Sequence, residues 1–525
     1  MRGRPLITVD FPEINYHFDN SHLAFIGFFL IPFFLRLFLL DYNDIWHSVS
    51  QPRLVALGSS YLLTALLGYF ALAKRVRGWK IAFSLLGILV LNQILIKTVY
   101  RYLIPGFSER AGDELVWLAE MRKYQVAGSI PMSRTVEGPG IFLLVSLISP
   151  IFAGDYSQTS IAIGLLLGSI YVLPLFAMQY RATNSRSLAL FATAISAQFD
   201  VIAYSTTIAR PTLIGLFLLP MLIYLFMEYR ARGEARFLLA FIPISLALLI
   251  IHPSFTYVVL LIILFATWLI FGFKARFEKI TSVLLFGIYG FTLKLAVPEL
   301  YGIWRIELLT QTPLRELNPE LFLLIFFAPP LFLLLFDAFR KRLAPYLRVK
   351  SFFVSLAAQR LILISIAFFA FASVFSFLVY RKYVDYISII YGGFPSFLTL
   401  HGWKIPMAIL ALYGLVKVIS AKPMSDTVCI TFAWLFSITL IVVFFLVYTP
   451  YQHHLNLYNL DERFFEFGIF PAAAFIAFAV DDLLRRMRSP TNRLLLIASF
   501  SAYVIPSIIV GMRDPVFFWG VFKPP

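Results

Sequence analysis

Long apolar runs separated by short polar loops constrain this chain more than any other feature. Roughly 20 apolar residues in a helix cross the hydrocarbon core of a bilayer. Of the 525 residues, 60% are hydrophobic and 14% are charged, whereas about 25% are charged in a soluble domain. The sequence therefore predicts an all-α polytopic membrane protein with about 15 transmembrane helices and no soluble domain. The expected spans lie near 21–40, 54–73, 81–104, 158–180, 187–207, 211–229, 235–251, 254–274, 281–297, 319–337, 361–381, 403–420, 427–448, 464–481 and 493–511.

The run 139–153 is shorter and is interrupted by Pro150. We expect an interfacial or re-entrant helix here rather than a span. Loop charge supports this choice, because omitting 139–153 places the basic loops on one side, as the positive-inside rule requires. These loops lie near 74–80, 181–186, 230–236, 274–279, 340–360 and 485–493. The N-terminus is then cytoplasmic. No A-x-A-like cleavage site follows 21–40, so we expect this run to be a retained anchor and the protein a multi-pass protein of the cell membrane.

Charge, cysteine content and motifs exclude several classes of function. The net charge of +16 is better explained by basic loops that meet anionic membrane lipid than by nucleic-acid binding. The single cysteine, Cys429, lies inside an apolar run, which excludes internal disulfides and cysteine-based metal sites. The sequence contains no Walker A, G-x-G-x-x-G or G-x-S-x-G motif. An ATP-driven pump and a nucleotide-sugar enzyme are therefore not indicated.

Acidic groups, histidines and arginines mix in the loops expected on the outer face. Asp113 and Glu114 follow the span 81–104 and open an amphipathic segment, 113–127, which predicts a surface helix. Two interpretations stay open for this acidic pair. An acid in the first helical turn complements the helix dipole, whereas a carboxylate beside a cavity can act as a general base toward an attacking hydroxyl.

Other charged groups also have two interpretations each. Asp200 lies deep in the run 187–207, where a carboxylate needs either a polar structural partner or a functional cavity. Arg210 precedes Pro211 in a tight outer turn; its guanidinium either binds a phosphate in a bidentate manner or extends to the membrane interface. Arg305, in the outer loop 298–318, is a further cation of this kind.

The histidines lie in outer turns. A lone residue such as His252, which precedes Pro253, is more often a helix-end residue than a catalyst. Late in the chain, polar groups are densest around His453, His454, Asp461 and Arg463. Metal binding is one interpretation, but the spacing matches no zinc signature. We therefore predict no metal site and no certain cofactor, and leave a requirement for a divalent cation open.

The arrangement over roughly 81–297 resembles the GT-C glycosyltransferases, multispanning enzymes that use polyprenyl-phosphate-linked sugars. The resemblance rests first on Asp113-Glu114, which is similar to the Asp-Glu motif of protein O-mannosyltransferases. It also rests on Glu137-Gly138-Pro139-Gly140 before the interfacial helix, and on the expected helix pair joined by the turn from Phe199-Asp200 to Arg210-Pro211. Late in the chain, Asp461-Glu462-Arg463 resembles the start of a C-terminal helix of such enzymes. Two spans precede the usual first one, and Gly138-Pro139 stands where many relatives have His-Pro or Tyr-Pro. The Trp-Trp-Asp motif and large soluble domain of oligosaccharyltransferases are absent, which argues against that branch.

This resemblance implies two extra N-terminal helices in 1–80, a catalytic module in 81–300 with an outer loop at 105–157, and a variable C-terminal module in 301–525. It also implies an inverting hexosyltransferase-like enzyme with its active site outside. The donor would be a polyprenyl- or dolichyl-phosphate-linked sugar, and the acceptor a glycan, lipid or protein. Asp113 would be the general base, with Glu114 second. Arg210, Arg305, Arg463 and His252 would hold the leaving phosphate, with Asp200, His453, His454 and Asp461 as further site candidates.

Two rival functions remain. A transporter or flippase of lipid-linked sugars predicts an internal repeat and polar groups near the bilayer midplane. We find no repeat, and only Asp200 and Lys294 are expected deep in the membrane. The other rival is a membrane scaffold that kept the GT-C arrangement without its activity.

Overall fold

The computed structural model describes residues 51–98, 119, 123, 140–198, 211–253, 255–296, 326–343, 404–420, 425–448 and 460–486. Most of these residues are helical and none lies in a β-strand, which confirms the all-α prediction for this part of the chain. The helices of the first half are α2 (Gln51–Ala73), α3 (Trp79–Thr98), α6 (Gly140–Ile148), the 3-10 helix η4 (Ser149–Phe152), α7 (Tyr156–Ile170), α8 (Val172–Thr183), α9 (Arg186–Gln198), α11 (Pro211–Arg232) and α12 (Ala235–Ile251). Those of the second half are α13 (Thr256–Phe271), α14 (Arg276–Ala296), α17 (Ala328–Leu343), α20 (Lys404–Ser420), α21 (Asp426–Tyr448) and α22 (Leu460–Arg486).

Four helical segments within the described residues are long and apolar enough to cross a membrane: Trp79–Thr98, Tyr156–Thr183, Pro211–Arg232 and Phe467–Arg485. Shorter apolar helices accompany them, including Ala235–Ile251 and Thr256–Phe271. The expected spans 21–40, 361–381 and 493–511 lie outside the described residues. The structure therefore supports a membrane protein of apolar helices, while the number of about 15 spans stays a prediction.

The segment Tyr156–Thr183 consists of two helices that meet at Tyr171. Pro174 explains the break, because proline has no amide hydrogen to donate to the carbonyl four residues earlier and its ring crowds that carbonyl. Tyr171 itself keeps near-helical dihedrals and caps α7, donating its backbone N–H to the Leu167 carbonyl at 3.1 Å. Its side chain is fully buried. The break thus leaves a tyrosine inside the helix bundle.

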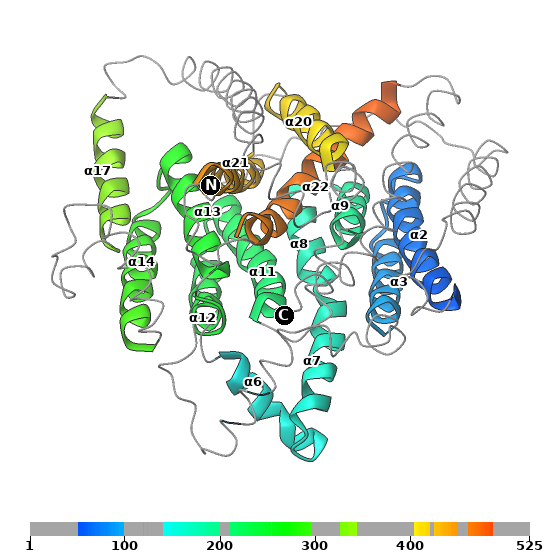
Figure 1. The fold of residues 1–525 in the computed structure, drawn as a ribbon. Coiled ribbons are helices and arrows are strands. Elements are labelled where there is room, and N and C mark those ends of the chain that lie inside the picture. Colours follow the sequence, from blue (N-terminus) through cyan, green and yellow to red (C-terminus); the bar gives the residue numbers. More distant parts are fainter. Residues whose placement is uncertain are drawn as a thin grey trace.

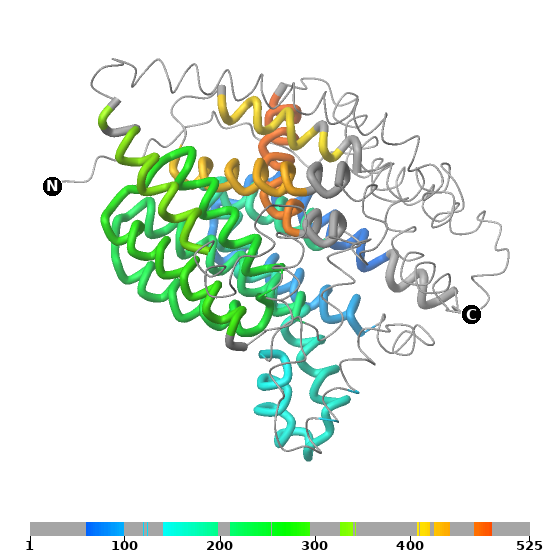
Figure 2. Tube along the Cα trace, turned by 60° about the vertical axis from the view of Figure 1, so that its left-hand side comes forward, coloured from blue at the N-terminus to red at the C-terminus, as the bar shows by residue number. Residues whose placement is uncertain are grey.

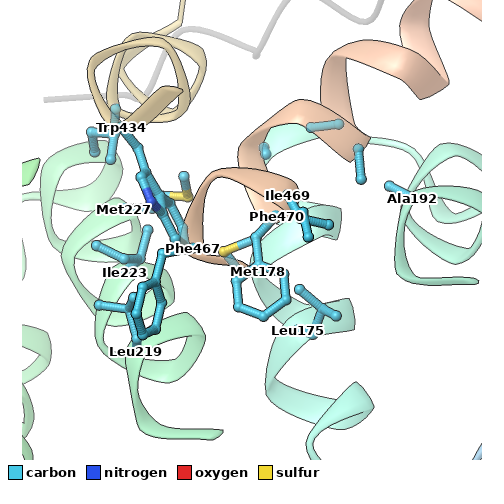
Figure 3. Close-up of a cluster of buried hydrophobic side chains, with 14 of the residues drawn as sticks. Leu175, Met178, Ala192, Leu219, Ile223, Met227, Trp434, Phe467, Ile469 and Phe470 are labelled. Atoms are coloured by element: carbon cyan, nitrogen blue, oxygen red, sulfur yellow. The ribbon is translucent and has the colours of Figure 1, made fainter. Parts of the chain in front are cut away.

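The centre of the core lies where α8, α11, α21 and α22 meet (Figure 3). Phe467 and Phe470 of α22 project between Met178 of α8 and Leu219 of α11, with Trp434 of α21 beside them. The indole of Trp434 meets the Phe470 ring edge-on, with centroids 6.1 Å apart. Helices from both halves of the sequence therefore enclose one apolar core (Figure 1).

Ion pairs connect the ends of several helices next to the basic loops. Glu228 of α11 lies between Arg181 of α8 at 3.3 Å and Arg232 at 2.6 Å. Arg230 of α11 pairs with Glu278 of α14 at 3.2 Å, and both side chains are buried. Further pairs are Lys274–Asp426, Lys279–Asp337 and Lys417–Asp482. These ion pairs connect α8, α11, α14, α17 and α21 near the basic segments 181–186, 230–236 and 274–279, while the side of the membrane on which they lie stays a prediction.

Glu278 lies in the first turn of α14, before the expected span 281–297. Its carboxylate also accepts a hydrogen bond from the backbone N–H of Lys274 at 2.9 Å. Burial raises the pKa of Glu278 above its ordinary value, and the Arg230 guanidinium opposes that rise. The desolvation of the carboxylate is thus larger than its stabilisation by the neighbouring charge.

The helices α6 and η4 form a short hairpin with the start of α7, which projects beyond the other helices (Figures 1 and 2). Asp155 ends the hairpin turn by capping α7, accepting hydrogen bonds from the backbone N–H groups of Ser157 at 2.8 Å and Gln158 at 3.1 Å. Leu147 and Ile151 are more than three-quarters exposed. The segment Gly140–Phe152 is therefore helical but too short to cross a bilayer, in agreement with the prediction that it is not a span.

Candidate functional site

His252 is the one predicted site residue whose side chain lies in the described part of the chain. Asp461 and Arg463 lie in the first turn of α22, where the structure describes the backbone alone. The remaining candidates, Asp113, Glu114, Asp200, Arg210, Arg305, His453 and His454, lie outside the described residues. The site is therefore built from His252 and from described segments that adjoin the other candidates.

His252 caps the C-terminus of α12 and is 1% exposed. Its backbone N–H donates to the Leu248 carbonyl at 2.8 Å, and its own carbonyl accepts from the N–H of Tyr257 at 3.2 Å. The imidazole Nδ1 lies 2.5 Å from the hydroxyl oxygen of Thr256, in the first turn of α13. His252 is thus a helix-end residue, and its ring is held in one orientation by the next helix.

The His252–Thr256 pair packs against the start of α11. A Cβ atom on Gly215 would lie 3.0 Å from the Thr256 Cβ and closer still to its hydroxyl oxygen. Only glycine's hydrogen fits there, so the backbone of α11 approaches Thr256 directly. Because α11 begins at Pro211, His252 lies beside the first turns of the helix that Arg210 immediately precedes.

The start of α6 packs against the end of α12. A Cβ atom on Gly140 would lie 2.7 Å from the Cα of Ile251 and 2.9 Å from its backbone nitrogen. A small apolar cluster continues this contact and consists of Ile141, Phe142, Val145, Ile163 and Ile214. We call the three segments 140–142, 211–215 and 251–256 the junction. It brings the start of α6 to the first turns of α11 and to His252.

Sequence analysis assigned no role to a second polar cluster, which lies near the C-terminal end of α3. Lys97 is fully buried, and its Nζ lies 5.9 Å from the centre of the Tyr171 ring. Gln93, one helical turn earlier, is also fully buried. The signal was present in the sequence, because a lysine inside the apolar run 81–104 is costly in a membrane and marks a functional position by default.

No group of three or more histidine, cysteine, aspartate or glutamate side chains among the described residues is arranged to hold a metal ion. Cys429, the lone cysteine, is buried in α21. The described part of the junction instead offers an imidazole, a hydroxyl and the N-terminal end of α11. Such groups orient substrates and interact with anions.

No protein-family model matches the chain, and no curated protein matches it. Among solved structures, it is similar to the archaeal oligosaccharyltransferase AglB from Archaeoglobus fulgidus in complex with an inhibitory peptide and a dolichol-phosphate. The identity is 14% and the TM-score 0.48, over 84% of this chain and 56% of the other. For the structure of the A. fulgidus oligosaccharyltransferase tethered with an acceptor peptide, the identity is 12% and the TM-score 0.47, over 82% of this chain and 55% of the other. For the complex of this oligosaccharyltransferase with Zn and sulfate, the identity is 13% and the TM-score 0.41, over 73% of this chain and 45% of the other. The chain thus spans about half the length of these oligosaccharyltransferase chains.

Proposed function

We propose that the protein is a GT-C-type membrane glycosyltransferase. It moves a sugar from a polyprenyl-phosphate-linked donor to a glycan, lipid or protein acceptor at the outer face. The observation that carries the proposal is the junction. Its contacts bring the start of α6, which follows the acidic segment in sequence, together with the start of α11 and the His252 turn, although more than 100 residues separate Gly140 from Ile251 along the chain.

The proposed reaction forms a bond between the acceptor oxygen and the anomeric carbon of the sugar. The bond from that carbon to the phosphate oxygen breaks, and the polyprenyl phosphate leaves with the bonding electrons. Asp113 receives the proton of the acceptor hydroxyl, with Glu114 as the second candidate. Attack from the face opposite the leaving group inverts the anomeric centre. No ATP is needed, because the sugar–phosphate bond supplies the driving force.

Negative charge grows on the phosphate as the sugar departs, so cations near it lower the barrier. In the proposal, Arg210 supplies one such charge directly before α11, and the positive end of the α11 dipole reinforces it. His252 is held by Thr256 beside the same helix. Arg305 and Arg463 are the other proposed phosphate ligands, and Asp200, His453, His454 and Asp461 are secondary candidates for the same site.

The direct test is Asp113→Asn, which keeps the shape of the side chain but removes its basicity. The purified variant and wild type are supplied with membranes that contain lipid-linked hexose, and release of free polyprenyl phosphate is measured. We expect a loss of about 100-fold or more in the variant, the usual size of a general-base contribution. Asp155→Asn is the matched control, because asparagine caps a helix as well as aspartate does.

Normal transfer by Asp113→Asn would end the general-base assignment. Movement of lipid-linked sugar across the membrane by wild type, without release of polyprenyl phosphate, would favour the flippase. Absence of both would favour the scaffold.

A further inference from the structure

Arg186, the first residue of α9, lies over the indole ring of Trp79, the first residue of α3. Its guanidinium carbon is 4.3 Å from the centre of that ring, which is a cation–π contact. Its Nη1 also donates a hydrogen bond to the backbone carbonyl of Arg77, in the connection between α2 and α3. One arginine therefore joins the start of α9 to this connection and to an indole that is 40% exposed.

Trp79 belongs to a group of aromatic side chains at this end of α3. Its ring stacks on that of Phe83, one turn further along the helix, with centroids 5.3 Å apart. It also meets the ring of Tyr180 in α8 edge-on at 5.1 Å. Tryptophan and tyrosine are enriched where a membrane meets water, because their rings are apolar and their edges are polar. The group is therefore suited to contact lipid near its headgroups.

The connection between α2 and α3 is strongly basic. Residues 74–78 read Lys-Arg-Val-Arg-Gly, and Lys80 follows in the first turn of α3. The side chains of Lys74, Arg77 and Lys80 are exposed. The helices α2, α3, α8 and α9 contain no Asp or Glu. We refer to residues 74–80 together with Arg186 as the basic corner, which presents several positive charges and no acidic residue of its own.

Arg75 has a backbone conformation that arginine rarely adopts. Its φ is +46°, in the left-handed region where a side chain with a Cβ is unfavourable. The corresponding left-handed residues after α8, α11 and α13 are Asn184, Gly233 and Gly272, the residue types that tolerate this conformation. The basic corner therefore contains an arginine where the backbone favours glycine, and such a strained residue indicates a functional requirement.

An exposed face of α3 begins at the basic corner. Lys80, Ser84, Gly87 and Leu91 are separated by four, three and four residues and so lie on one face of the helix. All four are exposed. Nothing lies within 4 Å of the position that a Cβ atom on Gly87 would take. A hydrocarbon chain can therefore follow this face away from the charged end of the helix, with open space at the glycine.

We propose that the basic corner binds the headgroup of an acidic phospholipid, one of whose acyl chains lies along the exposed face of α3. Charge complementarity selects this lipid over a zwitterionic one, because each lysine or arginine near a membrane surface favours anionic lipid. The guanidinium of Arg186 and the ammonium of Lys80 are donors for phosphate oxygens, and Trp79 contacts the region below the headgroup. This lipid is not the sugar donor, so the proposal is independent of the proposed function.

The test titrates phosphatidylglycerol or phosphatidylcholine into the full-length protein in detergent and measures bound lipid by native mass spectrometry. Wild type should bind phosphatidylglycerol more tightly, and added salt should reduce this preference because exposed charges are screened. Lys80→Gln and Arg186→Gln should each weaken phosphatidylglycerol binding about fivefold, the usual effect of one basic residue near an anionic surface. Neither variant should change the binding of phosphatidylcholine.

Arg236→Gln is the matched control, because it removes the same charge from another basic loop. The Arg236 side chain is 69% exposed but pairs with Glu234 at 2.6 Å, so we expect wild-type binding of both lipids. Thermal unfolding shows which variants fold, and Lys80→Gln keeps the test decisive because it changes an exposed side chain.

Equal affinity of wild type for the two lipids would overturn the proposal, and so would unchanged phosphatidylglycerol binding in folded Lys80→Gln. An equal loss of binding in Arg236→Gln would also overturn it, because acidic lipid would then respond to the total charge of the protein and not to the basic corner.

Discussion

The side-chain amide of Gln179 donates a hydrogen bond to the backbone carbonyl of Phe470 at 2.7 Å, although 291 residues separate them. Gln179 lies on α8 and is fully buried, so this bond fixes α8 against α22 inside the apolar core. An apolar surrounding makes an unmade hydrogen bond costly. The contact therefore links the predicted catalytic module to the C-terminal module.

Gln179→Leu should lower the free energy of unfolding by about 1 kcal/mol, the usual net value of one buried hydrogen bond. The measurement is the midpoint of denaturation in detergent. Gln158→Leu removes an exposed glutamine at the start of α7 and serves as the control. Equal midpoints for Gln179→Leu and wild type would contradict the assigned role.

Gly414 should not tolerate a side chain. A Cβ atom there would lie 2.7 Å from the Phe475 carbonyl carbon and 3.1 Å from the Ala479 nitrogen, so α20 would have to move away from α22. We expect Gly414→Leu to unfold at a clearly lower temperature, by several degrees. Gly87→Ala is the counterpart, because nothing lies within 4 Å of its Cβ position and alanine favours a helix by about 1 kcal/mol. A tolerated Gly414→Leu would show that the two helices do not pack this closely.

Thr256→Val should reduce catalysis. It keeps the shape of the side chain but removes the hydroxyl that lies 2.5 Å from the His252 Nδ1. We expect release of polyprenyl phosphate to fall roughly fivefold, corresponding to one hydrogen bond. Thr267→Val is the matched control on the same helix, since the Thr267 hydroxyl bonds only to the Ile263 carbonyl of its own helix at 2.8 Å. Equal loss in both variants would remove His252 from the proposed site.

The pKa of Glu278 predicts a pH effect on stability. Because burial raises this pKa above 4.5, the folded state binds the proton more tightly than the unfolded state does. The contribution of protonated Glu278 to the free energy of unfolding is therefore complete at a pH below the ordinary glutamate pKa. It is lost as the pH rises through the raised pKa of the folded state. Glu278→Gln has no such titration. The unfolding free energy of wild type minus that of the variant should therefore fall as the pH rises above about 4, the ordinary titration range of a glutamate.

Glu234→Gln, which removes an exposed acid from the connection before α12, is the control for this measurement. A difference between wild type and Glu278→Gln that stays constant over the same pH range would show that desolvation does not control this carboxyl group.

Helix bounds were predicted best where polar or proline-containing turns mark both ends. The expected run 235–251 coincides with α12, because Gly233 and Glu234 precede it and Pro253 follows it closely. The run 158–180 lies within the single candidate span Tyr156–Thr183, which Pro174 divides into two helices. The run 319–337 corresponds in its described part to α17, which begins at Ala328. Proline is favoured in the first turn of a helix, so Pro329 and Pro330 explain why α17 begins at Ala328. Hydropathy, from which the run was predicted, does not contain this information.

The site was less predictable than the helices. The sequence nominated His252 and correctly favoured a helix-end position. It could not show that Gly140 and Gly215 allow the backbones of α6 and α11 to approach the turn after α12, because such contacts depend on tertiary packing. Lys97 was overlooked, although its position inside an apolar run was visible. The catalytic assignment to Asp113 lies outside the described residues and stays a prediction.

The contact of Phe467 and Phe470 with α8 and α11 has a consequence for biosynthesis. A ribosome makes α8 and α11 more than 200 residues before it reaches α22, so their contacts with Phe467 and Phe470 form only after α22 has been made. Until then, Met178 and Leu219 must face lipid or a translocation partner. A chain that stalls before residue 460 would therefore enter the membrane with the surface of α8 and α11 that α22 covers in the finished protein still uncovered.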